Sequence, residues 1–176
     1  MRGLIFTELY ELIEDKFGFE MLDNIIVDAG VPNDGAHTST GNYPFSELLA
    51  LVVQLHKKSE LPIETLLEVF GEQLFKKLIS AHPQFDEKIN VLDFLENVEL
   101  YIHHEVQKLY PDAELPKFDI VSKDEKSFVF YYNSSKQLHH LAKGLILGAS
   151  KHFLNPVTIE MIPQEDKRVL FTVSLI

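Results

Sequence analysis

The sequence predicts an α+β fold, in which a helical N-terminal part precedes further helices packed with a four-stranded antiparallel sheet. Up to about residue 110, apolar residues recur at helical spacing between glycine and proline stops. After residue 117 they alternate as in paired strands, and helices followed by a sheet is an element order of α+β domains. The 176 residues, 45% of them hydrophobic, suffice for one domain that buries about 70% of its unfolded surface. We expect a single domain over 1–176, with a helical subdomain over about 1–60 and a second subdomain over about 61–176.

Glycine and proline mark the ends of the expected helices. Gly18 and Gly30 are typical helix stops, Pro44 suits the start of a helix, and Pro111 ends one. Residues 31–44, rich in Pro, Asn, Gly, Ser and Thr, form the one long loop. Helices are therefore expected at Leu4 to Phe17, Phe19 to Ala29, Phe45 to Lys58, Pro62 to His82, Val91 to Tyr110 and Gln137 to Phe153.

Four short segments show the period-2 alternation of strands. They form two pairs, joined by polar turns at residues 123–126 and 163–167. The strands are expected at Phe118 to Lys123, Ser127 to Asn133, Val157 to Ile162 and Val169 to Ile176. Two such hairpins supply the four strands of the predicted antiparallel sheet.

Helical phase separates two adjacent histidines in the fifth helix. Residues advance about 100° per position, and the apolar stripe of this helix falls within about 60° of one line. Its members are Val91, Leu95, Val98, Ile102, Val106 and Leu109. His103 then borders the stripe, whereas His104 faces water. A neutral imidazole beside an apolar pocket is a good metal ligand, and the alternative is a core-edge histidine that a backbone carbonyl satisfies.

Charge and composition restrict the classes of function. The net charge of −11 and the pI near 5.1 disfavour binding to nucleic acid or to an anionic membrane surface. The absence of cysteine excludes disulfides, cysteine-ligated zinc or iron–sulfur sites, and the covalent attachment of c-type haem. The sequence has no signal peptide and no run of about 20 apolar residues, so we expect a cytoplasmic protein.

Several short motifs occur along the chain in a defined order. They are Met1-Arg2-Gly3, Ile102-His103 with Leu109-Tyr110-Pro111, Leu115-Pro116, Tyr132-x-Ser134-x-Lys136, and Gly144-Leu145-Ile146-x-Gly148. In this order and spacing they resemble the H-NOX family, the haem-nitric oxide/oxygen binding domains that occur alone in bacteria and as the sensor module of soluble guanylate cyclase. The resemblance covers essentially the whole chain, although no single motif is specific by itself.

The resemblance implies a non-covalently bound haem b and assigns roles to five residues. By this resemblance His103 is the iron ligand and Pro116 presses on the porphyrin. Tyr132, Ser134 and Lys136 hold the haem propionates, with lysine where the family has arginine. Lysine keeps the charge but lacks the bidentate fork, so a looser clamp is expected. Without the resemblance, structural roles are favoured for these three residues, namely an outward strand residue, a turn or helix cap, and a solvated charge.

The resemblance also implies which residues face the bound gas. The distal wall has six aliphatic members, namely Ile5, Leu9, Leu74, Leu78, Leu141 and Leu145. Oxygen-binding members carry a hydrogen-bonding tyrosine at the position of Leu141, and a buried hydrogen bond of that kind is worth about 1–3 kcal/mol. The apolar wall therefore favours nitric oxide and carbon monoxide over oxygen. One exception stays open, namely a hydrogen-bond donor from His139 or His140, which lie near this segment.

We interpret the sequence as that of a haem b nitric oxide sensor rather than an enzyme. The resemblance implies that nitric oxide weakens the bond between iron and His103, that strain held against Pro116 and Ile5 relaxes, and that the N-terminal helices shift. Because no output domain is visible among the 176 residues, the expected partner is a separate histidine kinase or diguanylate cyclase.

Two other classes of protein stay open. A peroxidase-type haem enzyme needs a distal acid–base pair, and the only arginines, Arg2 and Arg168, are not placed to supply one. A non-haem metal protein would use the histidine pairs at 103–104 and 139–140. Adjacent histidines on a helix point about 100° apart, so the members of a pair cannot share one ion unless the helix bends.

Overall fold

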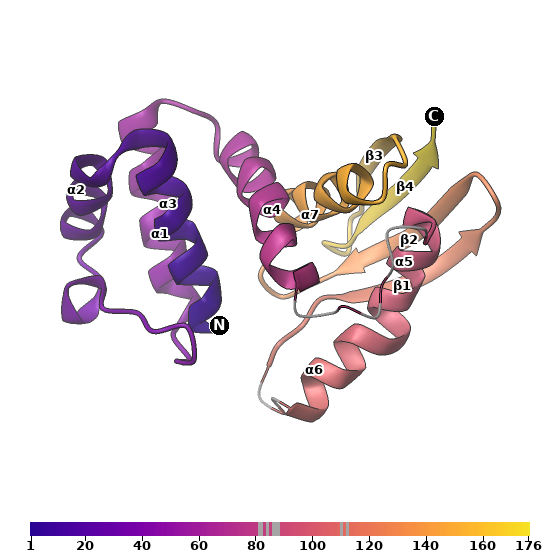
Figure 1. Ribbon diagram of the computed structural model, residues 1–176, viewed down its shortest axis with the longest axis horizontal. Coiled ribbons are helices and arrows are strands. Elements are labelled where there is room, and N and C mark those ends of the chain that lie inside the picture. Colours follow the sequence, from indigo (N-terminus) through magenta and orange to yellow (C-terminus); the bar gives the residue numbers. More distant parts are fainter. Residues whose placement is uncertain (81–82, 84, 86–88, 110, 112) are drawn as a thin grey trace.

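Figure 1 shows the computed structural model, with a lobe of helices at one end and a sheet flanked by helices at the other. The structure describes residues 1–80, 83, 85, 89–109, 111 and 113–176. The elements follow the predicted order, with helices first and then an antiparallel sheet that includes one further helix, so the α+β fold class is confirmed. Within the described part of the chain, no helix has the length and apolar character needed to cross a bilayer.

The N-terminal lobe is built from three helices and a short turn. They are α1 (Gly3–Phe17), α2 (Phe19–Ala29), the 3₁₀ turn η1 (Pro32–Gly35) and α3 (Phe45–Ser59). Gly18 separates α1 from α2 with a φ of 85°, a conformation that glycine adopts at no steric cost. The predicted helices of this lobe and the long loop between α2 and α3 are confirmed to within a residue or two at each end.

Helices α4 (Ile63–Ser80) and α7 (His139–His152) cross at very close range. A Cβ atom added at Gly71 of α4 would lie 2.4 Å from a backbone carbonyl oxygen of α7. One added at Gly144 of α7 would lie 2.1 Å from a backbone carbonyl oxygen of α4. Both distances are far below van der Waals contact, so this crossing requires glycine on both helices.

Two helices have limits in the structure that differ from the predicted ones. The helix predicted to reach His82 is described as far as Ser80, and residues 81–82 lie outside the described residues. The last helix begins at His139 rather than at Gln137. Gln137 has a φ of 52°, and a residue in the left-handed region cannot belong to a right-handed helix.

The single α-helix predicted from Val91 to Tyr110 is wrong. The structure has α5 (Val91–Asn97), a π-helical turn η2 (Val98–Ile102) and α6 (His103–Leu109), and residue 110 lies outside the described residues. A π turn inserts one extra residue into the helix, so a constant advance of 100° per residue does not hold across η2.

The π turn coincides with the point at which this helical segment leaves the core. The amide N–H of His103 donates to the carbonyl oxygen of Val98, an i→i+5 hydrogen bond. Val91 and Leu95 of α5 are buried, whereas no residue of η2 is buried. The predicted apolar stripe is therefore buried at Val91 and Leu95 of α5 and partly exposed at Val98, Ile102 and Val106.

The sheet has four antiparallel strands in the order β1-β2-β4-β3 (Figure 1). The strands are β1 (Lys117–Lys123), β2 (Ser127–Asn133), β3 (Val157–Pro163) and β4 (Val169–Leu175). Alternate residues of β2 and β4 point into the core, and the paired Phe130 and Phe171 stack there with ring centroids 5.2 Å apart. The two predicted hairpins and the four-stranded sheet are confirmed.

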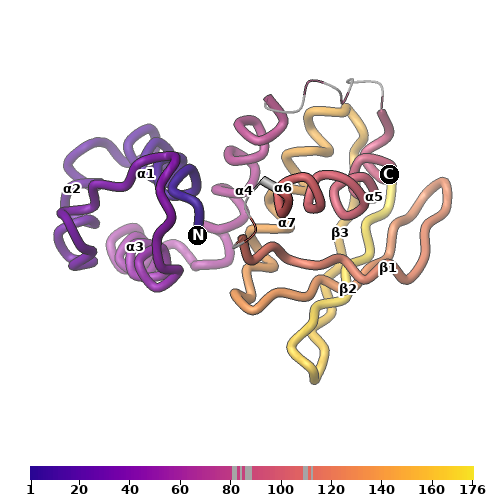
Figure 2. Tube along the Cα trace, turned by 90° about the horizontal axis from the view of Figure 1, so that it is seen from below, coloured from indigo at the N-terminus to yellow at the C-terminus, as the bar shows by residue number. Residues whose placement is uncertain are grey.

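The side chains gather in two hydrophobic cores, which we call the lobe core and the sheet core. The lobe core lies among α1, α2 and α3 and includes Phe70 and Leu74 of α4 and Leu141 of α7. The sheet core lies between the sheet, α5 and α7. Leu145 of α7 packs against both cores. Helices α4 and α7 thus connect the two halves of the molecule (Figures 1 and 2).

The close crossing of α4 and α7 can be tested by adding one methyl group. We expect Gly144→Ala to lower the free energy of unfolding by about 1–3 kcal/mol, because overpacking against a backbone carbonyl outweighs the helix propensity that alanine gains. Urea unfolding followed by circular dichroism measures the change. The control is Lys76→Ala on the exposed face of α4, which should stay within about 0.5 kcal/mol of the wild type. Equal stability of Gly144→Ala and the wild type would contradict the crossing.

Candidate functional site

His103 is held in one orientation by two neighbours. Its Nδ1 atom lies 3.0 Å from Oε2 of Glu99, in the preceding π turn. Its ring meets the ring of Phe118 edge-on, with centroids 5.3 Å apart. A carboxylate on Nδ1 keeps the proton on that atom, so the lone pair of Nε2 is available to a metal. In place of the backbone carbonyl considered as the alternative, the carboxylate of Glu99 is the hydrogen-bond partner of His103.

The other three histidines of the two predicted pairs lie in different surroundings. His104 is exposed, as the phase argument predicts. His140 has its Nδ1 atom 2.9 Å from Glu68, and its ring centroid lies 4.7 Å from that of His139. Across the residues that the structure describes, no group of three or more His, Cys, Asp or Glu side chains is placed to hold a metal ion. The non-haem alternative therefore has no assembled ligand set in this part of the chain.

Tyr132, Ser134 and Lys136 meet in the turn between β2 and α7. Tyr132 is only 4% exposed, and burial raises the pKa of its hydroxyl although Ser134 and the backbone of Leu138 hydrogen-bond to it. The hydroxyl of Ser134 accepts a hydrogen bond of 3.2 Å from the amide N–H of Lys136. The three predicted residues thus form one polar turn at the edge of the sheet core.

Lys136 is paired rather than solvated. Its side chain is 12% exposed, and its ammonium group forms an ion pair with the carboxylate of Glu114. The hydrogen bond from Lys136 holds the pKa of Glu114 below the usual range of a glutamate. Glu114 precedes the half-buried Pro116 by two residues, so the ion pair fastens the polar turn to the segment that carries this proline. The contact of Lys136 with a propionate stays a prediction.

The six predicted distal residues all belong to or pack against the lobe core. Each of three helices supplies two of them: Ile5 and Leu9 from α1, Leu74 and Leu78 from α4, and Leu141 and Leu145 from α7. The nearby His140 is engaged by Glu68. His139 has a buried Nδ1 atom with no hydrogen-bond partner among the described residues, and burial lowers the pKa of its imidazole. It is therefore uncharged at neutral pH.

Arg168 is engaged at the hairpin between β3 and β4. Its guanidinium lies 4.3 Å from the ring centroid of Tyr131 and forms ion pairs with Asp166 and Asp119. It is thus occupied by partners from the sheet and its turn. This geometry gives no support to the peroxidase alternative, because Arg168 forms no pair with a distal histidine.

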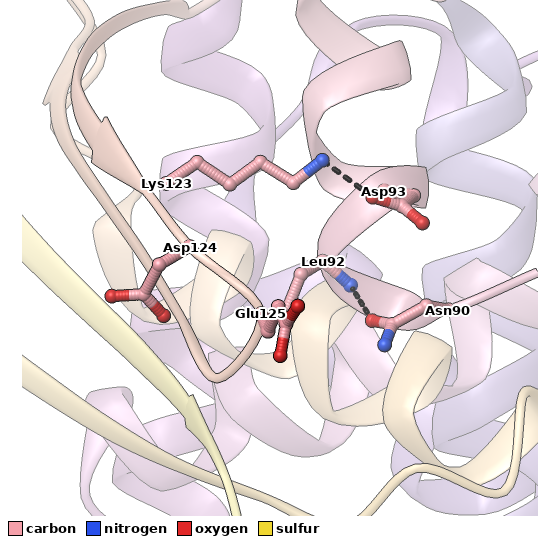
Figure 3. Close-up of a pocket in the computed structure, with 6 residues that line it drawn as sticks. All are labelled: Asn90, Leu92, Asp93, Lys123, Asp124 and Glu125. Atoms are coloured by element: carbon pink, nitrogen blue, oxygen red, sulfur yellow. Dashed lines mark hydrogen bonds and ion pairs between the residues drawn. The ribbon is translucent and has the colours of Figure 1, made fainter.

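An open surface cavity of about 450 Å³ lies beside α5 and the β1–β2 turn (Figure 3). Its lining residues are Asn90, Leu92, Asp93, Lys123, Asp124 and Glu125. Lys123 forms ion pairs with Asp93 and with Glu96, and Figure 3 shows it extended toward Asp93. The cavity contains none of the predicted site residues, and its charged wall does not suit the apolar ring of a porphyrin.

Two carboxylates beside the site are absent from the sequence prediction. Glu99 is four residues before His103, and this i,i+4 spacing on a helix is a signal that identifies it. Glu114 pairs with Lys136 across 22 residues, and no local pattern reveals a contact of that range.

The fold and the geometry around His103 define an α+β domain in which a carboxylate orients a helical histidine beside the sheet core, and comparison with known proteins identifies the family. Residues 2–161 match the model of the Haem-NO-binding family, so the chain belongs to this family. Its H-NOX domains bind haem and are gas sensors rather than enzymes. The resemblance seen in the sequence is thus confirmed.

Solved H-NOX structures match the whole length of the chain. The unliganded Fe(II) H-NOX protein of K. algicida is 36% identical over 100% of this chain and 97% of its own, with a TM-score of 0.92. The H-NOX protein of S. oneidensis with Fe(II)NO is 25% identical over 100% and 99%, with a TM-score of 0.89. The H-NOX of Shewanella woodyi with Fe(II)CO is 38% identical over 99% and 94%, with a TM-score of 0.84. No match was found among curated protein sequences.

The residues present fit a haem. A single imidazole with its Nδ1 atom held by a carboxylate suits one axial position of an iron. Tyr132 and Phe118 belong to the sheet core, the six aliphatic residues pack with the lobe core, and Leu145 contacts both. Such a seam suits a flat apolar ring whose acidic edge needs polar partners, and the turn of Tyr132, Ser134 and Lys136 offers them.

The assignment of the metal ligand predicts different behaviour for the two adjacent histidines. His103→Ala should abolish haem retention unless imidazole is supplied, because it removes the one oriented ligand. His104→Ala should leave the visible spectrum nearly unchanged, because this side chain is exposed. The measurement is the Soret absorbance per protein after gel filtration, with and without imidazole. Haem loss in His104→Ala together with retention in His103→Ala would reverse the assignment.

The predicted contact between Lys136 and a haem propionate can be tested by replacing this lysine with arginine. Lys136→Arg should slow the transfer of haem to an apo-acceptor several-fold, since a bidentate fork contributes about 1 kcal/mol more than a point charge. The control is Lys151→Arg on α7, whose charge pairs with Glu72. Transfer rates are measured at two salt concentrations. Identical rates for wild type and Lys136→Arg at both salts would mean that Lys136 serves only Glu114.

Proposed function

We propose that this chain is a nitric oxide sensor that binds the gas at ferrous haem b and signals through a change of conformation to a separate protein. Membership of the Haem-NO-binding family supports the cofactor. Related H-NOX proteins bind these gases, since the structure from S. oneidensis is in the Fe(II)NO state and that from Shewanella woodyi is in the Fe(II)CO state. We further propose a cytoplasmic location, in keeping with the absence of cysteine.

The observation that carries the choice of gas is the aliphatic character of the distal set. A hydrogen-bond donor in an apolar pocket stabilises polar bound oxygen by about 1–3 kcal/mol, which is about ten- to a hundredfold in affinity. Nitric oxide depends little on such a donor. Leu141, where oxygen-binding members have tyrosine, offers none, and Glu68 engages His140 of the same helix. We infer that nitric oxide is the physiological ligand and that carbon monoxide also binds.

The chain's own residues suggest how binding is converted into movement. His103 would hold the haem iron, which when bound would supply the site for the gas. We propose that His103 turns away on α6 when the gas binds, and that strain held against Pro116 and Ile5 then relaxes. We propose that residues 1–60 shift as a unit relative to residues 61–176, the haem-bearing part, as one of two packings becomes favoured.

We propose that a histidine kinase or a diguanylate cyclase reads this shift. The chain covers nearly the whole length of the solved H-NOX protein of K. algicida. We propose that a partner in trans converts the conformational change into a chemical signal. Co-purification with either class of enzyme, and dependence of its activity on nitric oxide, would discriminate the two.

The apolar wall makes a testable prediction about gas selectivity. The ferrous wild type should contain five-coordinate haem, bind nitric oxide and show no stable oxygen complex in air. Leu141→Tyr should raise oxygen affinity about ten- to a hundredfold by donating a hydrogen bond, whereas Leu141→Phe, of similar size but without the hydroxyl, should not. Visible spectra in aerated buffer measure this. A persistent oxygen complex in the wild type would show that a donor such as His139 reaches the bound gas.

A further inference from the structure

Glu99 makes two contacts through a single oxygen atom. Its Oε2 lies 3.0 Å from Nδ1 of His103 and accepts a hydrogen bond of 3.0 Å from the amide N–H of Phe118. The side chains of Glu99 and His103 are 20% and 18% exposed, so both contacts are largely shielded from water. Glu99 therefore connects the π turn, the predicted iron ligand and strand β1.

The contacts lie where the chain departs from regular structure. Glu99 belongs to the π turn η2, which ends where His103 begins α6. Phe118 is the second residue of β1 and follows Pro116 by two positions. Isolated π turns occur often at functional sites, because the extra residue re-aims the side chains around it. Here the turn brings a carboxylate, an imidazole and the start of a strand to one point.

We propose that Glu99 is a positioning residue that fixes the tautomer of His103, strengthens its bond to the haem iron, and couples movement of the histidine to β1. The part that concerns the iron rests on the proposed role of His103 as ligand. A carboxylate on Nδ1 keeps the proton there and directs Nε2 to the metal, and its negative charge increases electron donation from the ring. Such outer partners of metal-bound histidines commonly change metal affinity by about 10–100-fold.

The coupling to the strand follows from the shared oxygen. If His103 turns, Oε2 of Glu99 either moves with the Nδ1 atom or loses its hydrogen bond to it. Because the same oxygen accepts from the amide of Phe118, either change also affects β1. Phe118 also stacks on Phe130 of the sheet core, with ring centroids 4.6 Å apart. A change at His103 is thereby transmitted through Glu99 to the residues just after Pro116.

The single acceptor atom allows charge and geometry to be separated by substitution. In Glu99→Gln, the amide oxygen can occupy the place of Oε2 and accept from both donors, so the geometry is kept and the charge is lost. In Glu99→Ala, both contacts are lost. The matched control is Glu105→Gln, which removes the same charge from α6 at a side chain that is 62% exposed and paired with Lys108.

The first measurement needs no haem. Nitrogen-15 chemical shifts of the apo protein report which ring nitrogen of His103 carries the proton. We expect the Nδ1–H form in the wild type, in Glu99→Gln and in Glu105→Gln, and a shift toward the Nε2–H form in Glu99→Ala. A wild-type His103 that is protonated on Nε2, or a spectrum of Glu99→Ala identical to that of the wild type, overturns the positioning role.

The second measurement uses the ferrous holoprotein. Resonance Raman spectra should show a lower iron–histidine stretching frequency in Glu99→Gln and a still lower one in Glu99→Ala, with Glu105→Gln at the wild-type value. Haem transfer to an apo-acceptor should be about 10-fold or more faster in Glu99→Ala. An unchanged frequency in Glu99→Gln overturns the contribution of the charge. If even the wild type binds no haem, the proposed function fails, and the apo spectra alone then decide whether Glu99 positions His103.

Discussion

The contact of backbone on backbone between α4 and α7 is the constraint on which the rest of the structure depends. Gly71 and Gly144 let each helix press against the carbonyl groups of the other, closer than any side chain permits. Glu68 of α4 binds His140 and Lys143 of α7 alongside this crossing. The crossing thereby fixes the rotation of both helices. It also determines where their aliphatic residues point, because each helix supplies two members of the distal set.

The ion pairs of the crossing have a defined dependence on pH. Burial acts to raise the pKa of Glu68, but hydrogen bonds from His140 and Lys143 outweigh it, and the pKa lies below the ordinary value of 4.5. A lowered pKa in the folded protein means that the pair stabilises the fold at pH values above 4.5. This contribution is lost as the pH falls through the lowered pKa. The ionised Glu68 therefore contributes its full stabilisation of the crossing at neutral pH.

The sequence predicts most of this fold because most of its signals are local. Alternation in 117–133 and 157–175 predicts the two hairpins, and Gly18 predicts the break between α1 and α2. The π turn is missed because i→i+4 and i→i+5 hydrogen bonds suit the same apolar pattern, and tertiary contacts of α5 decide between them. The left-handed Gln137 is missed because only Gly, Asn and Asp commonly signal that conformation.

In the site as well, local motifs identify the main residues, whereas contacts between residues distant in the sequence are not predicted. His103 and the turn of Tyr132, Ser134 and Lys136 are identified by ordered motifs, and the structure brings the members of that turn together. The motifs do not reveal the carboxylates that bind His103 and Lys136. Glu114 reaches Lys136 across 22 residues, and no periodicity carries information over that distance. Glu99 differs, since its i,i+4 spacing from His103 marks it once the histidine is recognised as important.

The lobe itself is suited to transmit a shift as a rigid body, because a buried histidine joins its parts. The side chain of His37, from the loop between α2 and α3, is 2% exposed and stacks on Phe6 of α1, with ring centroids 4.2 Å apart. Its ring nitrogens lie 2.6 Å from the hydroxyl of Tyr10 in α1 and 2.8 Å from the carboxylate of Glu47 in α3. Burial, and then the charge of Glu47, raises the pKa of Tyr10 to about 12, so this hydroxyl keeps its proton at neutral pH.

We infer that a displacement at the predicted distal wall would therefore reach the far side of the lobe. Ile5, a member of the wall, is adjacent to Phe6 on α1, so neither residue can move along the helix axis without the other. Phe6 stacks on the ring of His37, and His37 connects the loop between α2 and α3 to Glu47 of α3. Because close-packed interiors resist internal deformation, the lowest-energy response to a push on Ile5 is movement of the whole lobe against α4 and α7. In the proposed mechanism the surface of α2 and α3 would then change its position relative to the sheet, and a partner protein would recognise this change.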